Sequence, residues 1–289
     1  MADAVRNAMS DGADRHDYDE AKRLVEHAVR VTPTFLCRLF TFRVQMHEGV
    51  MMDTAMTLLA FAVLHNNRAG DAFAEWICAN FPQSAVATPA GIGNYIDTLD
   101  AALLHNNRDW AKLVSQGHLA RRIDPNASLR VHDDYAFIRL YRRRPRADFI
   151  SAHAPKLFYW AYDANKAAVE ALTQLCLANV HAVDDCGRTV LHAIALGWGD
   201  TVLCTDDGPF RNLRSAESVR TCGTAMLYTQ LWGYFLKMGG FDEEARDADG
   251  KTADELLIET LADVHGDCWA AVSWSVWYNG CKDALGLAR

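Results

Sequence analysis

Apolar residues recur at helical spacing over most of this chain. Over 17–31 they share one helix face, and Pro33 ends the pattern. A second helix is expected over 33–46, with five large apolar side chains to bury: Phe35, Leu36, Leu39, Phe40 and Phe42. Residues 1–16 are polar and lack this periodicity, so they are expected to form a loose tail. Residues 1–50 are therefore predicted to be a tail followed by an N-terminal helical cap.

A short segment then repeats. The sequence Leu-His-Asn-Asn-Arg at 64–68 returns at 104–108, an offset of 40 residues. Each copy follows an apolar helical stretch, 54–64 or 95–104, and precedes another, 69–80 or 109–116. Asn tolerates the left-handed conformation, so the copies are predicted to be turns between paired helices. The alternative is that His65, Asn67, His105 and Asn107 are ligands on a catalytic face. A third helix pair is indicated at 157–177, with its turn at 163–166.

A turn signal followed by a helix entry occurs twice. At 184–195 the chain reads Asp-Asp-Cys-Gly-Arg-Thr-Val-Leu-His-Ala-Ile-Ala, and at 247–256 Asp-Ala-Asp-Gly-Lys-Thr precedes a second apolar helix. Gly187 and Gly250 suit a turn position with positive φ, and Thr189 and Thr252 suit a helix cap. The two glycines are 63 positions apart (250 − 187). Two shortened repeats, or one repeat with a long insertion, fit that spacing equally well.

These entries resemble the start of an ankyrin repeat, Thr-x-Leu-His-x-Ala after a turn glycine, with Val190 in place of the family's Pro. The residues that carry the resemblance, which would define the repeat, are Gly187, Thr189, Leu191, His192, Gly250 and Thr252. It implies that His192 bonds to its own and to neighbouring turns. It also implies an all-α fold, an ankyrin-like repeat solenoid of helix-turn-helix units with atypical helical caps. The degenerate array is expected at 51–262, with insertions near 118–150 and 201–221, and a Trp-rich capping helix at 263–289.

Two clusters are candidate partner-binding sites. Five arginines fall within 139–146, among them Arg142, Arg143 and Arg144, and they form either a solvated helix end or a site for an acidic partner. Trp269, Trp274 and Trp277 lie within nine residues, and they either cap the last repeat or dock a partner. Both alternatives stay open at this point.

Composition narrows the function classes. The net charge of −8 argues against nucleic acid as the main partner, and no apolar run approaches the length of a membrane span. Eight cysteines without any Cys-x-x-Cys pair fit reduced thiols in the cytoplasm or nucleus, and they do not indicate a metal site. No cofactor motif is present.

The predicted function is a protein–protein interaction module or adaptor that binds a partner protein, of unknown identity, through the repeat surface. A structural or virion-associated component that assembles through the same surfaces is the alternative, and host-directed viral ankyrin proteins supply the analogy. A third hypothesis is a hydrolase-type enzyme that uses His192 with Cys204 or Cys222, against which His192 already has a structural role in the repeat. The chain is therefore expected not to be an enzyme.

Overall fold

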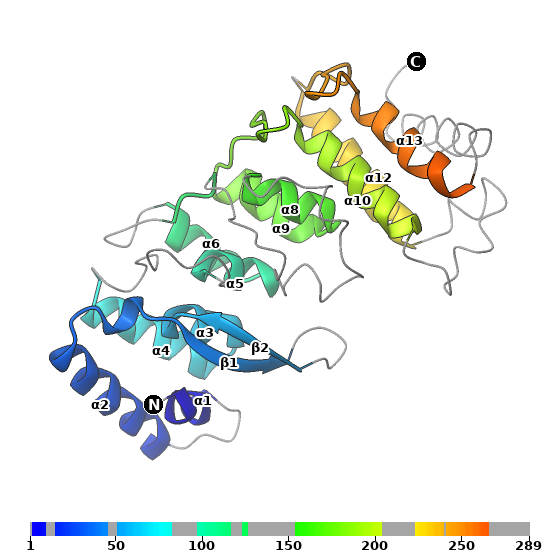
Figure 1. Cartoon of the computed structure of the whole chain (residues 1–289). Helices are drawn as coiled ribbons and strands as arrows, with labels where there is room; N and C mark the ends of the chain where they lie inside the picture. The colour runs from blue at the N-terminus through cyan, green and yellow to red at the C-terminus, as the bar shows by residue number, and fades with distance from the viewer. Residues whose placement is uncertain are drawn as a thin grey trace. The chain divides into compact units, whose positions relative to one another are not determined.

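The computed structural model describes residues 2–9, 15–45, 51–82, 97–116, 123–126, 154–203, 223–239 and 241–265. Most residues in these ranges are helical, as the sequence predicts, and one two-stranded antiparallel sheet joins the helices (Figure 1). Contacts divide the chain into two compact units. The first comprises Met1–Leu140 with Glu170–Leu177, and the second comprises Tyr141–Val169 with Ala178–Arg289.

The first unit begins with two helices. Helix α2, Arg15–Val31, agrees with the predicted helix, and its buried residues Ala21 and Val25 lie one turn apart. The expected loose tail is wrong for its first part, because Ala2–Ala8 form helix α1, which contacts α2. The physical reason is a short apolar stripe at the i, i+3, i+4 spacing, Val5, Ala8 and Met9, all of which are buried.

A β-hairpin replaces the second expected helix. After one 3₁₀ turn at Phe35–Cys37, strand β1, Phe40–Gln45, pairs antiparallel with strand β2, Met51–Met56. The prediction of a helix over 33–46 is therefore wrong beyond residue 37. The reason is a period of two: Phe42 is fully buried, whereas its neighbours Thr41 and Arg43 are exposed. Phe42 stacks on Phe61 with ring centroids 3.8 Å apart, so pairing with β2 also places an aromatic ring in the core.

Two helix pairs follow in the first unit. Helix α3, Leu58–His65, and helix α4, Arg68–Asn80, form one pair, and α5, Thr98–Leu104, and α6, Arg108–Ser115, form the other. Helix α3 contacts both α4 and α5, which explains why every residue from Leu58 to Leu64 is buried. The π-helical turn η3, Ala171–Leu175, packs on α6, where Gln116 donates a 2.6 Å hydrogen bond to the Leu175 carbonyl.

The second unit centres on helix α10, Val190–Leu203. It contacts α8, Lys156–Tyr162, and α13, Ala253–His265, as well as α12, Gly223–Met238 (Figure 1). A further helix, α9, Lys166–Glu170, follows α8. Helix α13 packs directly on α10, so the two helices that follow the turn glycines are neighbours in the structure.

The helices of this unit approach closely at one glycine. A Cβ atom on Gly197 of α10 would lie 2.0 Å from the Tyr162 carbonyl oxygen at the end of α8. The same carbonyl accepts a 2.8 Å hydrogen bond from the Tyr228 hydroxyl of α12. Tyr228 also contacts the Trp198 ring edge-to-face, with centroids 5.6 Å apart. Gly197 thus allows three helices to meet around one backbone oxygen.

Candidate functional site

The best-defined polar site of the described chain is a pair of turns in the second unit. In the first turn, the buried Asp184 carboxylate accepts hydrogen bonds from the backbone N–H groups of Cys186 at 2.9 Å and Arg188 at 2.8 Å. The backbone closes the same loop, with Asp184 N–H donating to the Arg188 carbonyl and Gly187 N–H donating to the Asp184 carbonyl. Gly187 has φ of +71°, the left-handed conformation that glycine adopts without steric cost.

The second turn reproduces this arrangement around Asp247. Its carboxylate accepts from the N–H groups of Asp249 at 3.0 Å and Lys251 at 2.9 Å. Asp247 N–H donates to the Lys251 carbonyl, Gly250 N–H donates to the Asp247 carbonyl, and Gly250 has φ of +78°. The two turns are therefore copies of one local structure, in which a buried Asp satisfies the backbone donors that a tight turn leaves free.

After each turn, a side chain three residues into the helix accepts a hydrogen bond from the N–H of the Thr that precedes the helix. In the second turn, Thr252 N–H donates to the Glu255 carboxylate at 3.0 Å while Glu255 N–H donates to the Thr252 hydroxyl at 3.3 Å, which is a capping box. In the first turn, His192 takes the place of Glu255, and its Nδ1 accepts from Thr189 N–H at 3.1 Å. The Thr189 hydroxyl lies 2.9 Å from the same nitrogen. The sequence predicted that this hydroxyl would cap an N–H group of the first helical turn, and the structure places it on the His192 ring instead.

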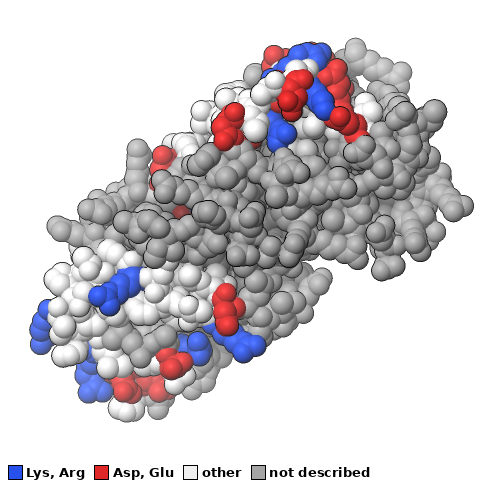
Figure 2. Space-filling view, in the orientation of Figure 1, with Lys and Arg blue, Asp and Glu red and all other residues white. Residues whose placement is uncertain are grey.

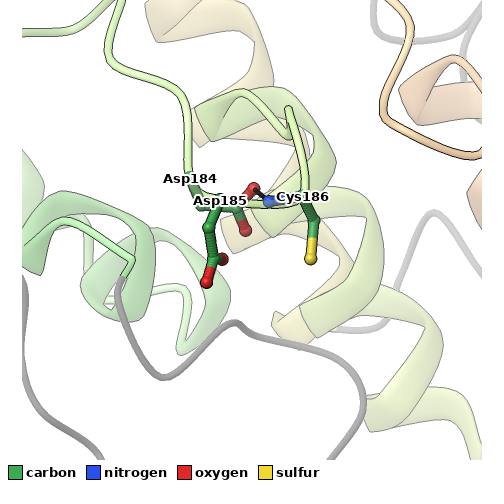
Figure 3. A group of neighbouring side chains, drawn as sticks. All are labelled: Asp184, Asp185 and Cys186. Atoms are coloured by element: carbon green, nitrogen blue, oxygen red, sulfur yellow. Dashed lines mark hydrogen bonds between the residues drawn. The ribbon is translucent and has the colours of Figure 1, made fainter.

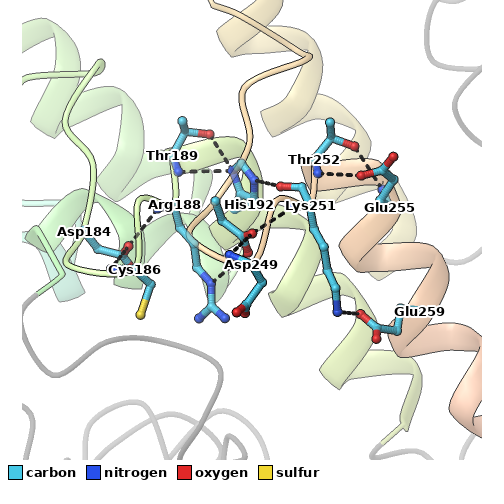
Figure 4. Close-up of polar contacts among 11 residues, drawn as sticks. Asp184, Cys186, Arg188, Thr189, His192, Asp249, Lys251, Thr252, Glu255 and Glu259 are labelled. Carbon is cyan, nitrogen blue, oxygen red and sulfur yellow. Dashed lines mark hydrogen bonds and ion pairs between the residues drawn. The ribbon is translucent and has the colours of Figure 1, made fainter.

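Three contacts join the two turns, and Figure 4 shows the two made by His192 and Arg188. Ala248 N–H donates to the Cys186 carbonyl at 2.8 Å. The Nε2 of the buried His192 lies 3.1 Å from the Lys251 carbonyl oxygen. The Arg188 guanidinium lies 3.7 Å from the Asp247 carboxylate, and both side chains are largely buried. These contacts hold the second turn in register on the first.

The electrostatics follow from this geometry. Burial lowers the pKa of His192, with the hydrogen bond to the Lys251 carbonyl acting in the opposite direction. Because Nδ1 accepts from a backbone N–H, the neutral ring carries its proton on Nε2 and donates it to Lys251. The bond from Thr252 N–H, followed by the nearby Arg246, lowers the pKa of the exposed Glu255 carboxyl. The hydrogen bonds of the two turns therefore favour a neutral His192 and an ionised Glu255.

One group of potential metal ligands lies in the first turn. Ligand atoms of Asp184, Asp185 and Cys186 all lie within 4.8 Å of one another (Figure 3). Asp184 already uses Oδ1 to accept two backbone N–H groups, one of them from Cys186 itself. Burial, followed by the nearby Asp184 carboxylate, raises the pKa of the Cys186 thiol, which opposes formation of a thiolate ligand. This cluster is accounted for by the turn.

The repeated Asn-Asn segments are also turn structures. Asn66 and Asn106 have φ of 44° and 53°, the left-handed conformation expected of them. Asn67 and Asn107 cap the following helices, their side chains accepting from Gly70 N–H at 2.7 Å and from Trp110 N–H at 3.3 Å. Asn107 also donates to the Asn66 side chain at 2.9 Å, which links the two copies. The structure therefore favours turns over a catalytic face.

The third copy of this turn varies the residues and keeps the geometry. Ala164 has φ of 54° at the position of the first Asn, and the Asn165 side chain accepts from Ala168 N–H at 3.1 Å.

Other candidate residues lie outside the described part of the chain. These are Arg142, Arg143 and Arg144, the tryptophans at 269, 274 and 277, and Cys204 and Cys222. His192, the remaining member of the hypothetical Cys/His pair, has both ring nitrogens engaged within the paired turns.

Sequence reasoning missed Asp247, Arg188 and Glu255 as members of the site. The Thr-x-x-Glu spacing of 252–255 was a usable signal for the capping box. The Arg188–Asp247 pair left no such signal, because it joins residues 59 positions apart (247 − 188).

The chain matches no family model, and it matches no curated protein. Among solved structures, it is similar to the crystal structure of EF0377, an ankyrin repeat protein, with 17% sequence identity and a TM-score of 0.36. The alignment covers 75% of this chain and 96% of that one.

Among the described helices, none has both the length and the apolar character needed to cross a membrane.

Proposed function

We propose that this chain is an ankyrin-type repeat protein that binds a partner protein through the tips of its paired turns. The observation that carries the proposal is the direct bonding of one turn to the next, since a rigid scaffold that presents exposed loop tips is a common way to build a binding surface. The interior polar groups of the pair, Asp184, Asp247 and His192, are buried and engaged in the turns. What remains at the tips for a partner is Asp185, Ala248 and Asp249, all exposed.

The charges of the tips indicate what kind of surface would fit. Lys251 pairs with Glu259, and Arg246 pairs with Glu255 at 2.9 Å, so these basic groups are partly neutralised. Asp185 and Asp249 form no ion pair with a described residue, and they leave an acidic excess at the tips. Figure 2 shows acidic and basic side chains intermixed over this part of the second unit. A partner with basic side chains spaced to meet Asp185 and Asp249 is the best match.

The arginines and tryptophans extend the proposal to segments outside the described residues. Arg142, Arg143 and Arg144 would attract an acidic region of the partner, and Trp269, Trp274 and Trp277 would cap the array or anchor the partner. A cytoplasmic or nuclear location is proposed with it, from the absence of a cysteine framework in the sequence.

The test begins with affinity purification of the full chain and identification of the co-purifying protein by mass spectrometry. Binding of that purified partner is then measured for the double variant Asp185→Lys with Asp249→Lys. The control is Glu20→Lys with Glu26→Lys, which makes the same charge change at exposed positions of α2. Loss of affinity in the first variant, with the control unchanged, supports the proposal.

Equal affinity of the two double variants and the unmodified chain would reject the turn tips as the binding surface. Assembly of the chain alone into concentration-dependent oligomers, disrupted by the tip substitutions, would instead support the structural component.

A further inference from the structure

The hairpin of the first unit carries a feature that repeat packing does not explain. Strands β1 and β2 pair only with each other among the described segments, and neither forms a backbone hydrogen bond to another described element. A two-stranded sheet leaves an outward row of N–H and C=O groups on each strand, and such an edge is a template for another strand. The edge of β1 holds six residues, about 20 Å at ~3.3 Å per residue.

The two faces of β1 differ in a way that selects a ligand. Phe42 is fully buried against Phe61, and the partly exposed Phe40 continues the apolar row, with its ring 5.2 Å from Phe35 and 6.3 Å from Phe42. On the opposite face, Thr41 and Arg43 are exposed. Arg43 lies opposite the exposed Asp53 in the register and forms no ion pair with a described residue.

We propose that the outer edge of β1 binds an extended segment of a partner protein in which apolar and acidic side chains alternate. Main-chain hydrogen bonds would align the segment with β1, its apolar side chains would continue the row at Phe40, and an acidic side chain would lie beside Arg43. The site uses different residues from the turn tips, so it stands or falls independently of them.

A second copy of the chain fits this edge less well. Full antiparallel pairing of six-residue strands would set residue 40 opposite residue 45, and so each even position opposite an odd one. Side chains directly opposite each other lie on the same face, so this register would put Phe42 of one copy on the same face as Arg43 of the other. An apolar side chain would then meet the charged face, which disfavours self-pairing over the full strand.

The probe is a synthetic eight-residue peptide of alternating valine and glutamate, titrated into the full chain. A matched peptide carries lysine in place of glutamate. Two further peptides keep the glutamates and carry N-methyl groups on either the odd or the even amides, which removes N–H donors from one edge at a time. Binding is followed by calorimetry and by the backbone amide NMR signals of residues 40–43.

We expect the glutamate peptide to bind up to about fivefold more tightly than the lysine peptide, the range that opposite cross-strand charges supply. Arg43→Glu should reverse this preference, and Arg43→Gln should remove it. One N-methylated peptide, whose blocked amides face β1, should lose binding, while the other should retain it.

Three results would overturn the proposal: no binding of any peptide at millimolar concentration, equal binding of both N-methylated peptides and their parent, or a charge preference unchanged by Arg43→Glu. Concentration-dependent dimerisation that is lost in Arg43→Glu would identify a second copy as the occupant and overturn it as well. None of these results changes the outcome of the Asp185 and Asp249 test, so the two proposals fail separately.

Discussion

His192 Nε2 and the Lys251 carbonyl oxygen lie 3.1 Å apart, although the residues are 59 positions apart in the sequence. This contact, together with the bond from Ala248 N–H to the Cys186 carbonyl, makes the second turn an extension of the first. The ring is buried, and its other nitrogen accepts from Thr189 N–H. One imidazole therefore satisfies a donor of its own turn and an acceptor of the next.

Substitutions of His192 should distinguish the contributions of its two hydrogen bonds to the free energy of unfolding. His192→Leu leaves a buried donor and a buried acceptor without a partner, so it should lower the free energy of unfolding by at least ~2 kcal/mol. His192→Asn keeps an acceptor near the Nδ1 position and loses only the contact with Lys251, so its effect should be smaller. Urea denaturation at pH 7.5 measures both, and equal stabilities of the unmodified chain and His192→Leu would contradict the role.

The pH dependence follows from the direction of the His192 pKa shift. Burial lowers the pKa of His192 in the folded chain below its unfolded value of 6.5. Below about pH 6.5 the unfolded chain therefore binds a proton that the folded chain does not, and stability falls as the pH falls towards the folded pKa. Above about pH 6.5 both states are neutral, and the full stability is present.

The stability difference between the unmodified chain and His192→Asn should thus be constant above pH 7 and shrink between pH 6.5 and 5. The nearby charged groups Asp184, Asp247 and Arg188 are the same in both proteins, so their own titration largely cancels in this difference. Urea midpoints across this range provide the check. A difference that does not vary with pH would show that His192 does not titrate differently in the two states.

The turn glycines should resist substitution for a conformational reason. Gly187 and Gly250 have φ of +71° and +78°, where β-branched residues are strained. Gly→Val at either position should lower the free energy of unfolding by at least ~1 kcal/mol. Gly250→Asn is the control, because Asn tolerates this conformation and no atom lies within 4 Å of the Cβ position at Gly250. Unchanged thermal midpoints of both valine variants would contradict the turn assignment.

Substitution of Gly197 by alanine should destabilise the chain, whereas the same substitution at an ordinary helix glycine stabilises it. Gly→Ala within a helix usually stabilises by roughly 0.5–1 kcal/mol. At Gly197 the new methyl would lie 2.0 Å from the Tyr162 carbonyl oxygen, so α8 and α10 must separate. Overpacking of this kind typically costs about 1–3 kcal/mol, and a net loss of stability is expected. Calorimetric melting decides the sign, and a raised midpoint would rule out the close approach of α8 to α10.

Asn67 should contribute to stability both as a helix cap and through its hydrogen bond to the end of α1. It accepts from Gly70 N–H and also donates to the Met9 carbonyl at the end of α1, 3.0 Å away. Asn67→Ala should lower the free energy of unfolding by about 1 kcal/mol or more through loss of the cap. Asn67→Asp retains the cap and loses only the donor to Met9, so its smaller effect measures the attachment of α1. Hydrogen exchange of the α1 amides should increase in both variants, and unchanged exchange would contradict that attachment.

The sequence could predict those parts of the structure that depend on a few consecutive residues. The left-handed conformations of Gly187, Gly250, Asn66 and Asn106 and the helix cap at Thr252 agree with the sequence patterns. Each such structure is set by hydrogen bonds that span at most a few residues along the chain, so a short motif contains most of the relevant chemistry.

The sequence could not choose between structures that depend on distant partners. Residues 33–46 carry an apolar spacing compatible with a helix and, over Phe40–Gln45, an alternation compatible with a strand. The strand conformation is stabilised by pairing with Met51–Met56 and by the stacking of Phe42 on Phe61. Such contacts stabilise only the folded chain, and local propensity does not reveal them.

The sequence by itself determined the mostly helical class, the two turn glycines and the helix cap at Thr252. Only the tertiary structure decided that α10 and α13, the helices that follow the two turn glycines, pack directly on each other. It also decided that Arg188 forms an ion pair with Asp247, and that the His192 ring bonds to the Lys251 carbonyl of the next turn. The reason is physical: local hydrogen bonds are set by neighbouring residues, whereas the choice of distant partners depends on which buried surfaces fit together.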